Sequence, residues 1–192
     1  MKKFLIVLLA VGAVGLFYFF RPAEIANYLS SGTDVIALGD SLTAGTGSAA
    51  GGGFVTMISD DLGLPVVNLG RNGDTTGKAL GRISELDRYR PKVVILLLGG
   101  NDYLAGVPRE VILSNLRQII DEIHKRGATV LLLGLDGSYE ELAEEKKTAY
   151  VSGILDGIFG RKELMSDGLH PNDRGYKLMA EKIEPALKEL MR

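Results

Sequence analysis

Residues 93–102 read VVILLLGGND, a run of six large apolar residues followed by two glycines and the polar pair Asn101-Asp102. A run that is apolar at every position over this length is typical of a strand buried on both faces of a sheet. Strands of that kind occur mainly in parallel sheets that carry helices on both sides. The stretch therefore predicts an α/β fold, with polar side chains at the carboxyl end of a central strand.

Apolar β-branched segments alternate with longer segments of helical periodicity through the rest of the chain. We expect strands at 34–38, 66–69, 93–98 and 129–135, and a short fifth strand at 150–155. We expect helices at 54–62, 77–86, 108–126, 139–148 and 172–191. This alternation predicts a parallel sheet of about five strands with helices on both faces.

Composition limits what the protein can do. The chain has 192 residues, 46% of them apolar and 24% charged, which suits one globular domain. Its formal net charge of −2 gives no electrostatic case for a nucleic-acid partner, which usually needs a basic face, so none is expected. The chain has no cysteine, which excludes disulfides, cysteine-ligated metals and a cysteine nucleophile. Any mechanism that needs a histidine must use His124 or His170, and histidine-rich metal sites are excluded.

Residues 4–20, FLIVLLAVGAVGLFYFF, form an uncharged run that follows Lys2 and Lys3. As a helix the run would be about 25 Å long, just short of a bilayer core. Two interpretations stay open for residues 1–21: a cleaved signal peptide, and an uncleaved signal anchor that crosses the membrane as a hydrophobic helix. The aromatic residues at 17–20 stand where a cleavage site needs small residues, which favours the anchor.

The two lysines before the run favour an N-terminus inside the cell. The main domain, residues 33–192, is then expected to face the periplasm or the cell exterior, or to be secreted if the N-terminal segment is cleaved. Residues 22–32 are interpreted as a short tether between the membrane segment and this domain.

Four polar segments stand where a parallel sheet would bring them together. Three follow predicted strands and the fourth precedes the last predicted helix: GDSL at 39–42, NLGRNGD at 68–74, GGND at 99–102 and DGLHPN at 167–172. Functional groups in such sheets gather at the carboxyl ends of the strands. We therefore expect these segments to form one site.

The residue types in these segments fit acyl transfer. Ser41 supplies a hydroxyl that becomes a nucleophile beside a base, and His170 can serve as that base. Asp167, three residues earlier, can hold the far nitrogen of the His170 ring and fix its tautomer. The N–H groups of Ser41 and Gly73 and the side-chain amide of Asn101 can donate to an oxyanion.

Each of these residues also has an ordinary structural interpretation. Ser41 can cap a helix, Asp167 can form a turn, and Asn101 can cap the turn that follows it. Gly73 can be present because the backbone needs a positive φ there, which is compatible with a role in the site.

Other polar residues are interpreted as structural. Asp40 and Asp102 are expected to accept hydrogen bonds from amides of nearby loops, and His124 to stabilise the end of a long helix. The stretch GTGSAA at 45–50 resembles a phosphate-binding loop but begins several residues after its strand, so no cofactor is expected. We interpret residues 44–53 as a mobile loop beside the site.

The four segments, with Gly73 in NLGRNGDTT and Asn101 in GGND, resemble the four sequence blocks of the SGNH (GDSL) hydrolases, in the same order. The resemblance covers essentially residues 33–191 and is strongest to the small bacterial lysophospholipase, thioesterase and arylesterase group. It implies a flavodoxin-like three-layer α/β/α fold, an ester or thioester hydrolase, and no metal or other cofactor.

Carried over by position, the resemblance implies Ser41 as nucleophile, His170 as base and Asp167 as the residue that orients the histidine. It implies Ser41, Gly73 and Asn101 as the oxyanion hole. The stretch 136–166 is short relative to that group of enzymes. Since loops beyond the fourth strand shape the acyl pocket there, the preferred acyl length stays open.

The sequence thus predicts a serine esterase or lipase-type hydrolase that cleaves lysophospholipids or short-to-medium acyl esters through an acyl-enzyme. Its expected partners are this substrate and, through residues 4–20, a membrane. Esters are favoured over thioesters, because acyl-CoA is scarce outside the cytoplasm. The alternatives are a carbohydrate O-deacetylase, an acyl thioesterase and a non-catalytic binding module.

Overall fold

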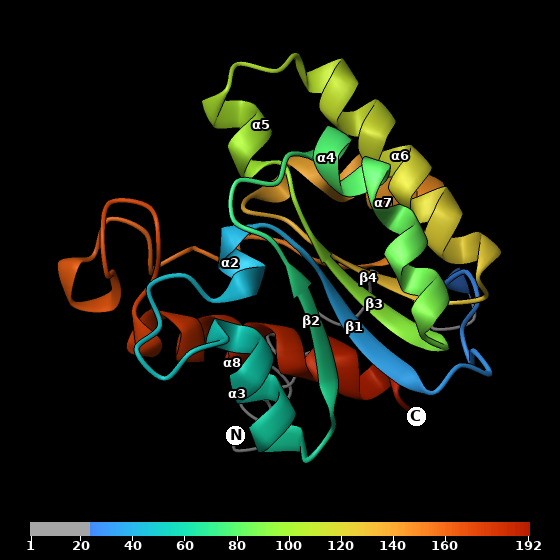
Figure 1. The fold of residues 1–192 in the computed structure, drawn as a ribbon, viewed down its shortest axis with the longest axis horizontal. Helices are drawn as coiled ribbons and strands as arrows, with labels where there is room; N and C mark the ends of the chain where they lie inside the picture. Colours follow the sequence, from blue (N-terminus) through green and yellow to red (C-terminus); the bar gives the residue numbers. More distant parts are fainter. Residues whose placement is uncertain (1–23) are drawn as a thin grey trace, which may run out of the picture.

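A five-stranded parallel sheet forms the centre of the computed structural model, which describes residues 24–192 (Figure 1). Its strands are β1 (Asp34–Gly39), β2 (Val66–Gly70), β3 (Pro91–Leu97), β4 (Thr129–Leu133) and β5 (Ala149–Val151), in the order β2-β1-β3-β4-β5. This is the order of flavodoxin-like folds, in which the winding reverses between β1 and β3. The predicted α/β fold with a five-stranded parallel sheet is confirmed.

Helices cover both faces of the sheet. On one face lie α3 (Gly53–Leu62) and α8 (Asp173–Leu190), and on the other lie α4 (Thr76–Gly81), α6 (Arg109–Lys125) and α7 (Glu140–Lys146). Figure 1 shows α3 and α8 on one side of the strands and α4 and α6 on the other.

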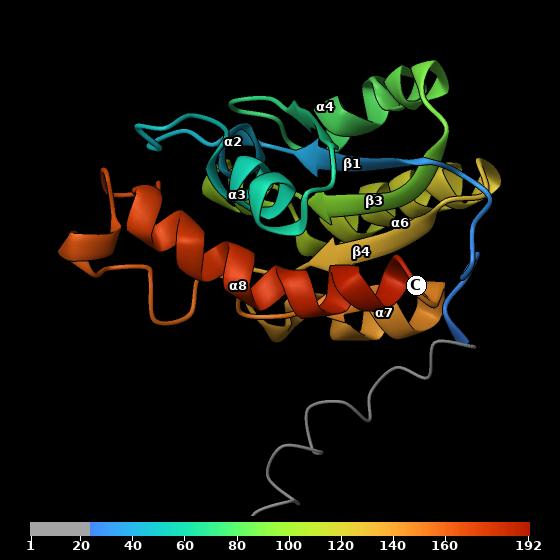
Figure 2. The same cartoon turned by 90° about the horizontal axis from the view of Figure 1, so that it is seen from below.

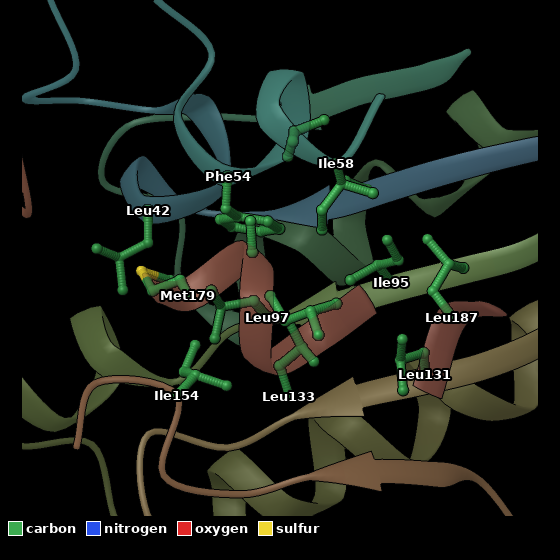
Figure 3. Packing of buried hydrophobic residues seen from close by; sticks show 14 of the residues in the cluster. Leu42, Phe54, Ile58, Ile95, Leu97, Leu131, Leu133, Ile154, Met179 and Leu187 are labelled. Atoms are coloured by element: carbon green, nitrogen blue, oxygen red, sulfur yellow. The ribbon is translucent and has the colours of Figure 1, made fainter. Parts of the chain in front are cut away.

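Alternate residues of each strand face opposite sides, so the sheet separates two apolar clusters. In β1, Val35 and Ala37 belong to the cluster under α3 and α8, whereas Ile36 and Leu38 belong to the cluster under α6. Figure 3 shows the first cluster, in which side chains of α3 and α8 meet those of the sheet: Phe54, Ile58, Met179, Leu187, Ile95, Leu97, Leu131 and Leu133. Leu42 also packs there, so the residue next to Ser41 is fixed in the core.

Three short helical elements lie beside these layers or beyond β4: η2 (Ile83–Arg88), η3 (Gly137–Tyr139) and η4 (Lys162–Leu164). The helix predicted over 77–86 is wrong as one element, because it is α4 followed by η2. The chain tightens at Arg82, whose N–H bonds the Ala79 carbonyl three residues back at 3.1 Å. The Arg82 side chain turns inward at this break and becomes buried.

The element η4 was not predicted, and neither were two α-helical turns, α2 (Ser41–Ala44) and α5 (Gly100–Leu104). Each is a single turn that follows the carboxyl end of a strand, β1 or β3. Four or five residues are too few to show helical periodicity in a sequence. Both turns carry candidate site residues, Ser41 and Asn101.

Part of the predicted tether, residues 22–32, packs against the domain. Ile25 is buried, and the Ala26 N–H donates to the Lys147 carbonyl at 2.8 Å. Asn27 Nδ2 donates to the His124 carbonyl at 2.9 Å and to the Ala128 carbonyl at 3.1 Å. These contacts lie at the amino ends of β4 and β5, and Figure 2 shows this blue segment at the edge opposite the arrowheads of β1, β3 and β4.

The hydrophobic helix predicted at 4–20 lies outside the described residues. Between residues 24 and 192, no helix combines the length and the apolar character that crossing a bilayer requires.

Candidate active site

Ser41 is the first residue of α2. A single residue, Asp40, separates it from the end of β1 at Gly39. The Asp40 side chain caps this turn by accepting from the Leu42 N–H at 3.0 Å, which is the structural role predicted for it. Gly39 allows the tight approach of β1 to β3 here, since a Cβ on it would lie 2.5 Å from the Leu97 carbonyl oxygen. The Ser41 hydroxyl is thus held by a capped turn on a close-packed strand end.

His170 and Asp167 reach Ser41 from the loop before α8. His170 Nε2 lies 3.0 Å from Ser41 Oγ, and His170 Nδ1 lies 2.8 Å from Asp167 Oδ2. Asp167 Oδ1 accepts from the N–H groups of Leu169 and His170, both at 2.7 Å. The structure therefore brings the three predicted residues into one chain of hydrogen bonds.

This loop is braced at its far end by Asn172. Its side-chain oxygen caps α8, accepting from Arg174 N–H at 3.0 Å and Gly175 N–H at 3.2 Å. Its amide donates to the carbonyls of Glu163 at 3.1 Å and Met165 at 3.3 Å. One residue therefore ties the loop that carries His170 to the start of the last helix.

Two aspartates near Ser41 have opposite electrostatic environments. The hydrogen bond from His170, with the N–H groups of Leu169 and His170, lowers the pKa of Asp167 to about 2. Burial raises the pKa of Asp40 from its ordinary value of 3.8 to about 6. Asp167 is therefore a carboxylate at neutral pH, as the orienting role requires, whereas the charge on Asp40 destabilises the fold.

Asn101 and Gly73 approach the same edge of the sheet. Asn101 lies in α5, and its Nδ2 donates to the Asp74 carbonyl at 2.9 Å. Gly73 has φ of 74°, a conformation that suits glycine. Asn101 lines a cleft with Ser41 and His170. Gly73 is not among the residues that line this cleft, and it is connected to Asn101 through the next residue, Asp74.

Asp102, the residue after Asn101, fixes the position of α5 through hydrogen bonds to α4. It is buried, and its carboxylate accepts from the Thr76 N–H at 2.8 Å and the Thr76 hydroxyl at 2.6 Å. These bonds tie α5 to the first residue of α4, and they confirm the structural role predicted for Asp102.

The cleft has a volume of about 830 Å³ and an apolar rim. Tyr103, Leu104, Phe159 and Leu169 line it with exposed fractions of 81, 62, 56 and 48%. Sequence reasoning missed all four, because exposed apolar residues in a single helical turn or in a loop have no periodic signal. Two more apolar residues line the cleft. Leu135 follows the end of β4, and Leu155 follows the end of β5.

The glycine-rich loop at 44–53 is anchored to α8. Ser48 Oγ donates to Asp173 Oδ1 at 2.6 Å, and the Tyr176 hydroxyl donates to the Thr46 carbonyl at 2.7 Å. Across residues 24–192, no three His, Asp or Glu side chains are grouped in a way that could hold a metal ion.

The buried Asp40 carboxyl predicts how stability depends on pH. Because its pKa is raised in the folded protein, the unfolded chain releases this proton first and stability falls as pH rises from about 4 to about 6. A shift of about two units corresponds to about 3 kcal/mol. Asp40→Asn keeps an oxygen for the Leu42 N–H and removes this loss. We expect the free energy of unfolding of the variant to rise by about 3 kcal/mol relative to that of the wild type between pH 3.5 and 7, as measured by urea unfolding of both proteins. Parallel pH profiles would contradict the assignment.

Comparisons with known proteins agree with this geometry. A model of the GDSL-like Lipase/Acylhydrolase family matches residues 37–138. The arylesterase of Vibrio mimicus is 31% identical over 174 residues, which cover 80% of this chain and 87% of that protein. The thioesterase 1/protease 1/lysophospholipase L1 of Escherichia coli (strain K12) is 27% identical over 175 residues, covering 82% and 84%.

The crystal structure of TesA has the same fold, with a TM-score of 0.76 and 31% sequence identity over 82% of this chain and 99% of that one. The family match spans the Ser41 and Asn101 segments, and the similarity to the arylesterase extends over 80% of the chain. This chain therefore belongs to the GDSL-like lipase/acylhydrolase family and is a carboxylic ester hydrolase.

Proposed function

We propose that the protein is a serine esterase that cleaves lysophospholipids and related short-to-medium acyl esters, with Ser41 as its nucleophile. One observation carries the proposal: Ser41 Oγ, His170 and Asp167 form a continuous chain of hydrogen bonds of 3.0 and 2.8 Å at the wall of an apolar cleft. That arrangement activates a hydroxyl for attack on a carbonyl carbon.

In the first half-reaction, Ser41 Oγ bonds to the ester carbonyl carbon while His170 Nε2 takes the hydroxyl proton. The tetrahedral intermediate then collapses, the carbon–oxygen bond to the alcohol breaks, and His170 gives its proton to the departing oxygen. In the second half-reaction a water molecule attacks the acyl-enzyme, and the same proton path releases the acid and restores Ser41. Asp167, ionised throughout because its pKa is about 2, holds the imidazole and stabilises its positive charge.

The developing oxyanion needs donors that are already in place. Asn101 Nδ2 has two protons, and its bond to the Asp74 carbonyl uses one and leaves the other to donate. The Ser41 N–H, near the start of its helical turn, and the Gly73 N–H are the other donors of the proposed oxyanion hole.

The cleft supports an acyl chain rather than a small acyl group. Its volume of about 830 Å³ is in the range that holds a drug-sized ligand, and its rim exposes four large apolar side chains. The names of the related proteins, arylesterase and thioesterase 1/protease 1/lysophospholipase L1, agree with acyl esters as substrates. Among these we favour oxygen esters, because the proposed location lies outside the cytoplasm.

The full-length chain should hydrolyse nitrophenyl esters of two to sixteen carbons, and its rate should increase with acyl length beyond the acetyl ester, because the rim is apolar. It should also release fatty acid from a lysophospholipid. Ser41→Ala should lower kcat by at least about 10³-fold, since no other group replaces the nucleophile. Ser48→Ala, which alters a serine of the neighbouring loop, is the matched control. An optimum at the acetyl ester would favour a deacetylase, and serine-independent turnover would refute the mechanism.

Asp167→Asn tests the orienting role. Its side-chain amide can donate to His170 Nδ1 and so stabilise the wrong tautomer, which leaves Nε2 protonated and unable to accept the Ser41 proton. We expect kcat to fall by roughly 10²–10⁴-fold with little change in KM. The control is Asp173→Asn, which alters the carboxylate at the start of α8 that accepts from the Ser48 hydroxyl. Steady-state kinetics and thermal unfolding separate lost function from lost fold, and near-normal kcat would remove Asp167 from the mechanism.

We propose that residues 4–20 attach the enzyme to a membrane, with residues 33–192 on the periplasmic or outer side. The support is the uncharged run itself and the two lysines before it. The full chain should stay with the membrane fraction through an alkaline carbonate wash, and deletion of residues 1–23 should release it. A mature protein that begins after residue 21 and is found in the medium would instead show a cleaved signal peptide.

A further inference from the structure

Arg82 is a buried cation that does not line the cleft but bonds the chain segments on either side of the site. Its side chain is 8% exposed. The guanidinium uses all three of its nitrogens: Nε donates to Asp74 Oδ2 at 2.7 Å, and Nη1 donates to Glu85 Oε2 at 3.3 Å. Nη2 donates to two main-chain carbonyls, Leu69 at 2.9 Å and Gly39 at 3.2 Å.

Two of the residues that accept from Arg82, Gly39 and Asp74, lead to the three donors of the proposed oxyanion hole. Gly39 is the last residue of β1, two positions before Ser41. Asp74 follows Gly73 directly, so its carboxylate fixes the turn that carries the Gly73 N–H. The main-chain carbonyl of the same Asp74 accepts from Asn101 Nδ2 at 2.9 Å.

We propose that Arg82 is a positioning residue for catalysis, which sets the distances among the Ser41, Gly73 and Asn101 donors. It joins the segments that carry Ser41 and Gly73 directly, and it acts on Asn101 through the Asp74 carbonyl that Asn101 binds. This inference rests on the proposed function, because the oxyanion hole is part of that mechanism. Arg82 touches neither substrate nor nucleophile. Its effect reaches the site through the carbonyl of Gly39 and through Asp74.

The geometry requires arginine rather than another cation. The acceptors lie on three separate pieces of chain, the ends of β1 and β2 and the turn after Gly73, and a planar fork can donate to all of them at once. A lysine ammonium is a single point on a flexible stem and reaches one or two of them. The charge itself is matched by the Asp74 carboxylate, whose side chain is 10% exposed, and by Glu85.

A positioning role predicts a specific kinetic effect. Oxyanion donors act in the transition state, so a shift in their positions lowers kcat and leaves ground-state binding in the apolar cleft unchanged. Loss of a whole donor costs roughly 10²–10³-fold in kcat, and displacement of donors costs less. We therefore expect Arg82→Lys to lower kcat by about 10–100-fold, with KM within about two-fold of wild type.

The matched control is Arg126→Lys. Arg126 is also largely buried and also joins carboxylates and a carbonyl, bonding Asp87 at 2.7 Å and the Glu122 carbonyl at 2.6 Å. It lies after α6, at the opposite edge of the sheet. We expect Arg126→Lys to lower the thermal midpoint by an amount similar to Arg82→Lys and to leave kcat unchanged.

Asp74→Asn is the second variant, and it decides the question if Arg82→Lys does not fold. It keeps the main-chain carbonyl that binds Asn101 and an oxygen that can accept from Arg82 Nε, and it removes the charge that holds the guanidinium. We expect kcat to fall by about ten-fold with KM unchanged. Both variants should bind a boronic acid, which forms a tetrahedral adduct with the active serine, more weakly by the same factor as kcat.

The experiment measures kcat and KM on the preferred nitrophenyl ester for the full-length proteins, corrected for the active fraction by complete fluorophosphonate labelling. The inference is supported if kcat and boronic acid affinity fall together in the Arg82 and Asp74 variants but not in Arg126→Lys. It is overturned if kcat stays within two-fold of wild type, or falls equally in the control. Activity that survives Ser41→Ala would instead refute the proposed function, so the two failures are distinct.

Discussion

Parallel pairing of β1 with both of its neighbours is the constraint on which the site depends. The registers match Gly39 with Gly70 on β2 and with Leu97 on β3, so three strands end at the same level. The turns that follow them hold Ser41, Gly73 and Asn101, and each turn begins from a strand end that is fixed by main-chain hydrogen bonds. The fourth segment comes from the loop before α8, which is packed on the same sheet. The site is therefore as rigid as the sheet edge that carries it.

Much of this arrangement follows from the sequence because it depends on signals that are periodic or continuous. The apolar runs give the strands, and parallel strands place everything that follows them at one edge, so the order of residues alone is enough to group the four polar segments. Arg82 could not be recognised in this way. In sequence it is one polar residue in an apparently amphipathic helix. Its side chain is buried by carbonyls of Gly39 and Leu69, which lie far from it along the chain and which its local sequence does not reveal.

The cleft shows a second limit of sequence reasoning. Tyr103 and Leu104 come from α5, whereas Phe159 and Leu169 come from loops far along the chain, and nothing local relates them. They form a common surface only because the fold brings α5 and the loops before α8 to the same cleft.

The pKa values of the two aspartates near Ser41 could not be predicted from the sequence either. Burial raises the pKa of Asp40 to about 6, and hydrogen bonds lower that of Asp167 to about 2, although the residue type is the same.

Ile25 and Asn27 pack at the amino ends of β4 and β5, so the start of the domain and the cleft lie at opposite ends of the sheet. The seven residues of β3 span about 23 Å, so the chain enters at one end of the sheet and the cleft opens at the other. In the proposed attachment through residues 4–20, the cleft would point away from the surface that holds the enzyme. With that attachment, lipids moving within the surface would not meet Ser41, and a substrate would first have to leave the bilayer. Single-chain lipids do so readily because one acyl chain binds only reversibly, whereas two-chain lipids stay behind. Under the proposed attachment, this orientation alone would protect the membrane that carries the enzyme from hydrolysis.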